Sequence, residues 1–195
     1  MTSFVNRAVL AAAVFAMAPA AANAATLVVN VAGSQGFGAL GTATNTVQTF
    51  NIGSLSQITG VAYNVNITAF TPSWLSEAAV SFTGSNVSGD GVNLTPGFDD
   101  DNSGTMSYAD SADLVALGLD FTVGADGILR LEYFETFNDT TVSPDSRWNS
   151  GTLTFTYTPA ATAVPEPASW AMMISGFGLV GGAMRRRSTL SFATA

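Results

Sequence analysis

The feature that most constrains this chain is a repeated alternation of apolar and polar residues with a period of two. It is clearest in residues 60–70 (GVAYNVNITAF), 118–123 (GLDFTV) and 151–159 (GTLTFTYTP). Such alternation is typical of β-strands that have one face against a core and the other toward water. We therefore predict strands in these three segments.

Further strands are indicated by segments rich in β-branched and aromatic residues, at 26–32, 42–51, 77–84 and 128–137. Turn clusters rich in Gly, Asn and Asp separate these segments. About seven or eight short strands with this spacing favour an all-β fold, an antiparallel two-sheet sandwich of jelly-roll-like type. Among the turns, residues 124–127 (GADG) predict a tight β-hairpin, because an Asp-Gly pair suits a two-residue turn.

The N-terminal residues 1–24 have the order of a secretory signal peptide. A positive charge at Arg7 precedes the apolar run 8–18, and Ala22-Asn23-Ala24 provides a small-residue cleavage site. A retained membrane helix would need about 20 apolar residues, more than this run contains. We therefore predict cleavage after Ala24 and export of the chain.

Three residue types are missing from the chain: Cys, His and Lys. Their absence excludes disulfides, His-ligated zinc, Ser–His and Cys–His nucleophile pairs and Schiff-base lysines, so we expect a protein that is not an enzyme. The net charge is −8, and between the two ends of the chain only Arg130 and Arg147 stand against every acidic residue except Glu166. Such a surface repels a phosphate backbone, so no nucleic-acid partner is expected.

The C-terminal part of the chain differs from the rest in composition. The run 168–184 has no charged residue, and three arginines follow it directly. As a helix it would reach only about 25 Å, which is marginal for a hydrocarbon core of about 30 Å. The arginines would remain on the cytoplasmic side and leave the Pro-Glu-Pro sequence outside. We therefore expect a short membrane-spanning helix preceded by an accessible, extended motif.

This tail closely resembles the PEP-CTERM protein-sorting signal in its PEPxxWA variant. The resemblance covers residues 164–188 and does not extend to the body of the chain. The residues that carry it are Pro165, Glu166, Pro167, Trp170, Ala171, Arg185, Arg186 and Arg187.

The resemblance implies a Gram-negative envelope protein that is the substrate of an exosortase, a transpeptidase-like integral membrane enzyme. It implies transient contact with the inner membrane, cleavage at or near Pro-Glu-Pro, and release to the cell surface or extracellular matrix. A plain C-terminal membrane anchor is the alternative. The expected organisation is a signal peptide at 1–24, a β-sandwich at 25–160, a Pro-rich linker at 161–167 and the sorting tail at 165–188.

A second motif lies in the stretch GFDDDNSGTMSYAD. Its acidic and hydroxyl residues follow the spacing of a twelve-residue calcium loop, in which alternate side chains supply oxygen ligands around a central Gly. An EF-hand has flanking helices, whereas Pro-Gly precedes this stretch, so a solvated acidic loop is the competing interpretation. The candidate ligands are Asp99, Asp101, Ser103, the Thr105 carbonyl oxygen and Asp110.

Other acids raise two further hypotheses. Asn138, Asp139 and Asp145 share one predicted loop and could form a separate cation site or complete the first one. A glycan hydrolase or lyase acting through Glu132, Asp139 or Asp145 would need two carboxylates in one cleft. Glu132 and Glu135 do not qualify as a pair, because strand residues three apart face opposite sides.

The tryptophans of the body bear on a third class of function. Trp74 and Trp148 could stack on sugar rings, as aromatic side chains do in carbohydrate-binding sandwiches, or they could pack at strand ends. A carbohydrate-binding module for exopolysaccharide requires one of them exposed beside polar groups. The leading expectation is a non-catalytic surface or matrix protein, with calcium as a stabilising ion if the acidic loop binds it.

Overall fold

The computed structural model describes residues 23–85, 91–160 and 167–186. The chain divides into two compact units, residues 1–160 and residues 161–195. Most of the expected signal peptide lies outside the described residues, so its cleavage stays a prediction. The first strand, β1 (Ala25–Asn30), begins directly after the expected cleavage point.

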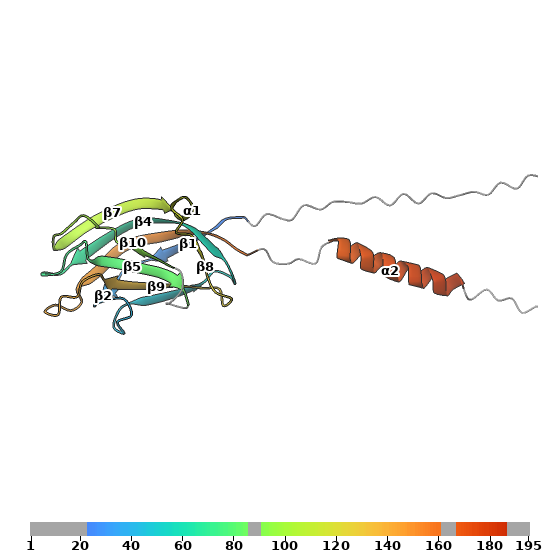
Figure 1. Cartoon of the computed structure of the whole chain (residues 1–195), viewed down its shortest axis with the longest axis horizontal. Coiled ribbons are helices and arrows are strands. Elements are labelled where there is room, and N and C mark those ends of the chain that lie inside the picture. The colour runs from blue at the N-terminus through green and yellow to red at the C-terminus, as the bar shows by residue number, and fades with distance from the viewer. Residues whose placement is uncertain (1–22, 86–90, 161–166, 187–195) are drawn as a thin grey trace, which may run out of the picture. The chain divides into compact units, whose positions relative to one another are not determined.

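The first unit consists of two antiparallel β-sheets that pack face to face (Figure 1). One sheet has the order β1-β10-β4-β7, with β2 beside β10 and β8 beside β4, and the other has the order β3-β9-β5-β6. The remaining bounds are β2 (Gln35–Gly36), β3 (Val47–Asn51), β4 (Gln57–Ala69), β5 (Ala78–Gly84), β6 (Gly91–Leu94), β7 (Gly104–Asp113), β8 (Phe121–Thr122), β9 (Ile128–Glu135) and β10 (Ser146–Thr158). A short helix, α1 (Leu114–Leu117), follows β7.

The order of the strands is that of a jelly roll. Apart from the two-residue strands β2 and β8, each sheet combines two strands from the first half of the sandwich with two from the second half. The all-β, two-sheet sandwich prediction is therefore confirmed, and its jelly-roll character follows from the pairing of distant strands.

The core lies between the two sheets and consists of the apolar side chains on the inward face of each strand. Phe155 of β10 meets Phe82 of β5 across this space, with ring centroids 5.1 Å apart, and Tyr133 of β9 meets Trp148 of β10 at the same separation. Each such side chain contributes about 1.5–3 kcal/mol on burial. The core residues that are fully buried with the largest side chains are Trp148, Tyr133, Phe82, Phe155, Ile58, Ile67, Leu114, Leu129, Leu131 and Leu153.

The predicted hairpin at residues 124–127 is wrong, although its turn is formed. The Gly127 N–H donates to the Gly124 carbonyl oxygen over 3.0 Å, and Gly127 has a φ of 71°. However, β8 before the turn pairs with β4 in one sheet, whereas β9 after it pairs with β3 and β5 in the other. The turn therefore connects the two sheets instead of two neighbouring strands. This is possible because β8 and β9 both carry apolar side chains and can each pack against the core from a different sheet.

A bulge near the start of β10 changes which residues face the core. The register against β4 shifts between Trp148 and Ser150, and Gly151 adopts a φ of 112°. Before the bulge Ser146 and Trp148 are buried, and after it Leu153 and Phe155 are buried. The period of two is thus interrupted by one residue, which a left-handed Gly makes possible.

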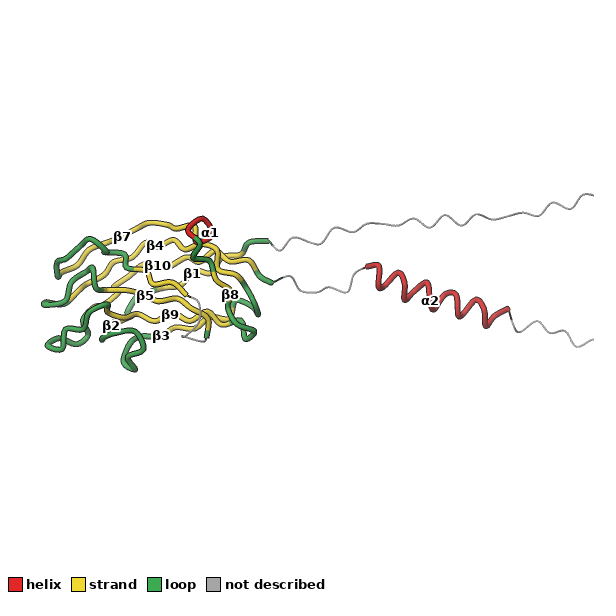
Figure 2. The backbone as a smooth tube through the Cα atoms, in the orientation of Figure 1, coloured by secondary structure: helices red, strands yellow, loops and turns green. Residues whose placement is uncertain are grey.

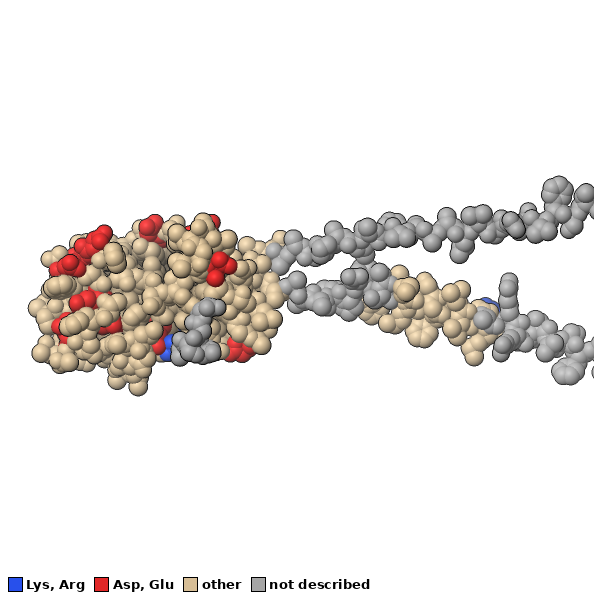
Figure 3. All heavy atoms as spheres, in the orientation of Figure 1, with Lys and Arg blue, Asp and Glu red and all other residues tan. Residues whose placement is uncertain are grey.

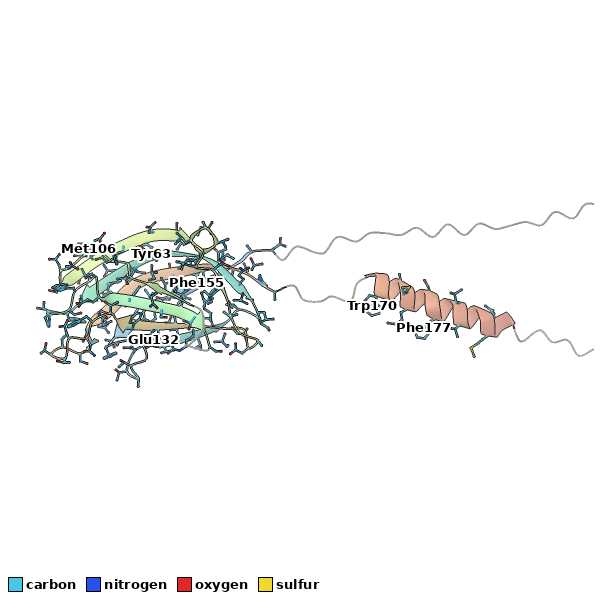
Figure 4. All side chains as sticks on the ribbon, in the orientation of Figure 1. Tyr63, Met106, Glu132, Phe155, Trp170 and Phe177 are labelled. Atoms are coloured by element: carbon cyan, nitrogen blue, oxygen red, sulfur yellow. The ribbon has the colours of Figure 1, made fainter. Side chains whose placement is uncertain are left out.

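The second unit contains helix α2 (Pro167–Arg186). Figure 4 shows Trp170 and Phe177 among its side chains. Among the described residues, no helix has both the length and the apolar character needed to cross a membrane. The expectation of a membrane-spanning helix in this tail therefore finds no support in α2.

Candidate functional site

Three connections meet at one end of the sandwich, which we call the loop pole: residues 70–77, 95–103 and 136–145. The Phe70 N–H donates to the Asp145 carbonyl oxygen over 2.8 Å, and the Leu75 N–H donates to the Asn102 carbonyl oxygen over 2.9 Å. These bonds tie the three loops together. Figure 2 shows loops gathered at this end, while Ala25 and Thr158 lie at the other end of the strands.

The loop pole contains a pocket of about 440 Å³, which we call the aromatic pocket. Trp74 is 45% exposed and Phe137 is 62% exposed, so both present large apolar surfaces to solvent. Two carboxylates stand beside these rings. The residues that line the aromatic pocket are Pro72, Trp74, Glu77, Phe137 and Asp139.

Glu77 holds one wall of the aromatic pocket in place. Its Oε2 accepts hydrogen bonds from the Trp74 N–H (2.9 Å) and the Ser73 Oγ (3.1 Å), which closes the turn that carries the indole ring. Its other oxygen, Oε1, accepts no hydrogen bond within the part of the chain that the structure describes. The carboxylate therefore uses one oxygen to hold the loop and leaves the other without a donor among the described residues.

Two more carboxyl groups lie buried next to the pocket. Glu135 and Asp145 both have no exposed surface. The Ser146 hydroxyl donates a short hydrogen bond to Glu135 Oε1, and the Asp139 N–H donates to Asp145 Oδ2 over 3.1 Å. Within the described residues, Glu135 Oε2 and Asp145 Oδ1 have no hydrogen-bond partner. Each buried group thus keeps one unsatisfied oxygen, an unfavourable state for a polar atom in a protein interior.

The four carboxyl groups act on one another, and we call Glu77, Glu135, Asp139 and Asp145 the acid cluster. Burial raises the pKa of Glu135 to about 8, and the charges of Asp145 and Glu77 add to this effect. Burial also raises the pKa of Asp145, with further contributions from Asp139 and Glu77. The charges that raise both pKa values are those of other acids, so the site has an excess of negative charge.

Basic residues do little to offset this charge. Arg130 forms an ion pair with Glu132 on β9, with 2.7 Å between Nη2 and Oε2, and Arg147 is the only other basic residue between residues 23 and 160. Acidic side chains dominate the charged surface visible in Figure 3. Among the residues that the structure describes, however, no three Asp or Glu side chains converge as they would around a metal ion.

The predicted calcium loop is not formed. Asp99, Asp101 and Ser103 lie in the loop 95–103, but Thr105 and Asp110 belong to strand β7. Over six residues a strand advances about 20 Å, which separates Asp110 from the start of β7 at Gly104. Asp110 lies opposite Tyr63 in the β4–β7 ladder. The spacing along the sequence was suitable, but a strand cannot wrap around an ion.

The loop acids are engaged in other contacts. Asp101 Oδ1 accepts a hydrogen bond from the Ser76 hydroxyl over 2.7 Å, and the neighbouring Asp100 accepts one from the Tyr108 hydroxyl over 2.9 Å. Hydrogen bonds from Asn102 and Tyr108 lower the pKa of Asp100. These contacts attach the loop 95–103 to its neighbours.

The structure separates the two tryptophans that sequence reasoning treated alike. Trp74 is exposed in the aromatic pocket, whereas Trp148 has no exposed surface and packs edge-on against Tyr133. A sugar contact by Trp148 is therefore excluded, because its ring lies inside the sandwich. The distinction depends on β10 extending back to Ser146, which places Trp148 within a strand.

Glu132 is also not available for chemistry. It is 1% exposed, and its Oε1 accepts hydrogen bonds from the Gly41 N–H (2.6 Å) and Asn45 Nδ2 (2.9 Å). Burial alone would raise its pKa, but these bonds and the Arg130 guanidinium outweigh burial and lower it. Of the three candidate residues in the loop 136–145, Asp139 and Asp145 are brought together, whereas Asn138 is exposed.

The residues of the predicted sorting motif fall partly within α2. Pro167 is its first residue, and Trp170, Ala171, Arg185 and Arg186 follow within it, with Trp170 56% exposed. Pro165, Glu166 and Arg187 lie outside the described residues.

The sandwich and the tail together define a class: a β-sandwich protein with a separate C-terminal helical segment. The particular segment is identified by comparison, because residues 163–187 match the family model of the PEP-CTERM protein-sorting motif. The chain thus carries a PEP-CTERM sorting motif, which implies export, membrane-associated sorting and an exosortase as the processing partner. No curated protein matches the chain.

Solved structures similar to the chain include viral coat proteins. The VP2 subviral particle of infectious bursal disease virus is 11% identical, with a TM-score of 0.29 over 74% of this chain and 35% of VP2. The Tobacco streak virus coat protein dimer is 13% identical, with a TM-score of 0.26 over 72% of this chain and 91% of that protein. Similarity at this level carries no argument about function or assembly.

Sequence reasoning missed several members of the site. Pro72, Glu77 and Phe137 were not singled out, because their proximity arises from the pairing of β5 with β9. One signal was present: each of the two loops carries an aromatic residue within three positions of an acid, Trp74 with Glu77 and Phe137 with Asp139.

Proposed function

We propose that this protein is an exosortase substrate that is exported and delivered to the cell surface or extracellular matrix, where it has a non-catalytic role. The match of residues 163–187 to the PEP-CTERM sorting motif supports this proposal most directly. The lack of Cys, His and Lys in the sequence supports the non-catalytic role, because thiol nucleophiles, His general bases and Schiff-base lysines are missing.

The sorting proposal is tested by changing the motif and following the tail. Replacing Glu166 and its flanking prolines by alanine should leave the chain unprocessed and retained with the membrane fraction. Mass spectrometry of the C-terminal peptide of surface-released protein reads out the cleavage. Trp74→Ala, a change in the sandwich, is the control and should be processed as the native chain is. Normal removal of the tail from the altered motif would contradict the proposal.

A second function, carbohydrate binding, is favoured by one observation: Trp74 and Phe137 are exposed together in the aromatic pocket beside two carboxylates. Exposed aromatic rings provide stacking surfaces for sugars, and adjacent polar groups fix their orientation. The volume of about 440 Å³ is within the usual range of small-ligand sites.

A glycan array with the purified protein tests this function. We expect Trp74→Ala to abolish the signal and Phe98→Ala to leave it unchanged. Phe98 is a suitable control because it is 77% exposed but lines a different pocket at the loop pole. Binding that survives Trp74→Ala would place the glycan elsewhere, and absence of any signal with the native protein would refute the proposal.

A further inference from the structure

The acid cluster favours a positively charged ligand in the aromatic pocket. Glu77 and Asp139 line the pocket, and Asp145 is joined to the Asp139 backbone by a hydrogen bond of 3.1 Å. Glu135 lies on β9, opposite Ala78, the residue that follows Glu77. All four carboxyl groups therefore lie at one place in the fold, and a cation is the ligand that this field attracts.

The two buried members of the cluster are an independent sign of a missing partner. Glu135 Oε2 and Asp145 Oδ1 are fully buried and have no hydrogen-bond partner within the described residues. An oxygen in this state is costly unless a donor or positive charge lies near it. A cation bound at Glu77 and Asp139 would offset the repulsion among the ionised members of the acid cluster.

The lining of the pocket distinguishes an organic cation from a metal ion. Calcium requires six to eight oxygen ligands at about 2.3–2.6 Å, and no three acidic side chains converge in this way among the described residues. Trp74, Phe137 and Pro72 instead supply apolar walls. Aromatic faces attract ammonium groups through their quadrupole, with Trp the strongest of the side chains.

We propose that the aromatic pocket binds a saccharide that carries free, protonated amino groups, an inference that rests on the carbohydrate-binding function proposed above. A sugar ring stacks on Trp74, and its ammonium group lies between the carboxylates of Glu77 and Asp139. A neutral sugar would leave Glu77 Oε1 and the Asp139 carboxylate without a charged partner after their water is displaced. The free amine therefore determines which saccharide is preferred.

The proposal is tested with two matched ligands: β-1,4-linked glucosamine oligomers and N-acetylglucosamine oligomers of the same length. Titration calorimetry with the purified protein should show at least about tenfold tighter binding of the free-amine oligomer, a difference of about 1.4 kcal/mol. Raising the salt concentration should weaken this binding, because much of it comes from exposed charges.

Variants locate the charge that recognises the amine. Asp139→Asn should weaken binding of the glucosamine oligomer several-fold and leave that of the N-acetylated oligomer unchanged. Asp110→Asn is the control, because it removes the same charge from an exposed residue on β7. Glu77→Gln should act as Asp139→Asn does, and its melting temperature shows whether the turn that Glu77 closes has remained intact.

The outcomes separate this inference from the function on which it rests. Equal affinity for the two oligomers would overturn the requirement for a free amine and leave carbohydrate binding in place. Binding of neither oligomer would overturn the inference, and failure of the whole glycan array would overturn the function as well. Equal binding of a simple alkylammonium ion and the oligomer would overturn the role of the sugar ring. If calcium alone raised the melting temperature more than the glucosamine oligomer does, and Asp139→Asn removed this rise, the ligand of the pocket would be a metal ion and the proposal of an organic cation would be wrong.

Discussion

Replacing Glu135 by Gln should make the protein more stable at alkaline pH while changing little at acid pH. Glu135 is fully buried, and burial, together with the charges of Asp145 and Glu77, raises its pKa to about 8. Gln has almost the same shape and can still accept the hydrogen bond from the Ser146 hydroxyl. It has no proton to lose, so it removes the pH dependence without opening a cavity.

The sign of the effect follows from comparing the folded and unfolded states. An unfolded Glu135 loses its proton near pH 4.5, whereas the folded carboxyl keeps its proton until about pH 8. The contribution of Glu135 to the free energy of unfolding is therefore fully present below pH 4.5 and is lost as the pH rises toward 8. At 1.36 kcal/mol per pH unit, this interval corresponds to a loss of about 5 kcal/mol for native Glu135. The Glu135→Gln variant should not show this loss.

Urea unfolding between pH 4 and pH 8.5 measures the effect. Glu132→Gln on the same strand is the matched control, because its carboxylate is stabilised by Asn45, Arg130 and the Gly41 N–H and its pKa is lowered. Removing that charge should destabilise the protein at neutral pH, and the difference should stay constant down to about pH 4.5 and shrink only below it. Between pH 4.5 and pH 8.5 the effect of Glu135→Gln should thus grow with pH, whereas that of Glu132→Gln should stay constant. A constant difference between Glu135→Gln and the native protein across this range would show that the pKa of folded Glu135 is not raised.

Three further predictions concern the sandwich. Gly151→Ala should lower the free energy of unfolding by at least about 2 kcal/mol in urea titrations, because a Cβ would overlap the Asn64 carbonyl oxygen at a φ of 112°; a loss below 1 kcal/mol would contradict this account. Trp148→Ala should cost about 3–5 kcal/mol in the same titrations, whereas Trp74→Ala should cost under about 1 kcal/mol, and similar costs for both would be at odds with their burial. Millimolar calcium should shift the melting temperature by less than about 1 °C, because the Asp110 side of the expected loop is a strand; a larger shift that Asp110→Asn removes would contradict this.

The sandwich could be predicted from the sequence because burial on one face leaves a period of two. Residues 60–70 and 151–159 show this period, and they lie in β4 and β10, the central strands of one sheet. The start of β10 at Ser146 was not predicted, since the bulge at Gly151 interrupts the alternation. β7 was missed because both of its faces are largely exposed, so no apolar period marks it.

The site could be predicted only in part, because it is assembled from separate loops. Trp74 was predicted from residue type alone, and Trp148 seemed equivalent until its place in β10 was known. Glu135 illustrates the limit: the alternation correctly separated it from Glu132, but its burial beside Asp145 depends on long-range pairing. No local pattern indicates that a carboxyl group will be enclosed by residues far away in the sequence.

The direction of β10 has a consequence under the proposal that the protein is delivered to a cell surface. Its first residue, Ser146, adjoins the loop pole, and its last, Thr158, leads into the segment before the sorting tail. Thirteen residues of strand span about 40 Å. If the tail side is the anchored side, the sandwich serves as a rigid spacer that carries the loop pole outward. Neighbouring molecules could then be densely attached, and the aromatic pocket of each molecule would remain accessible to a long polymer.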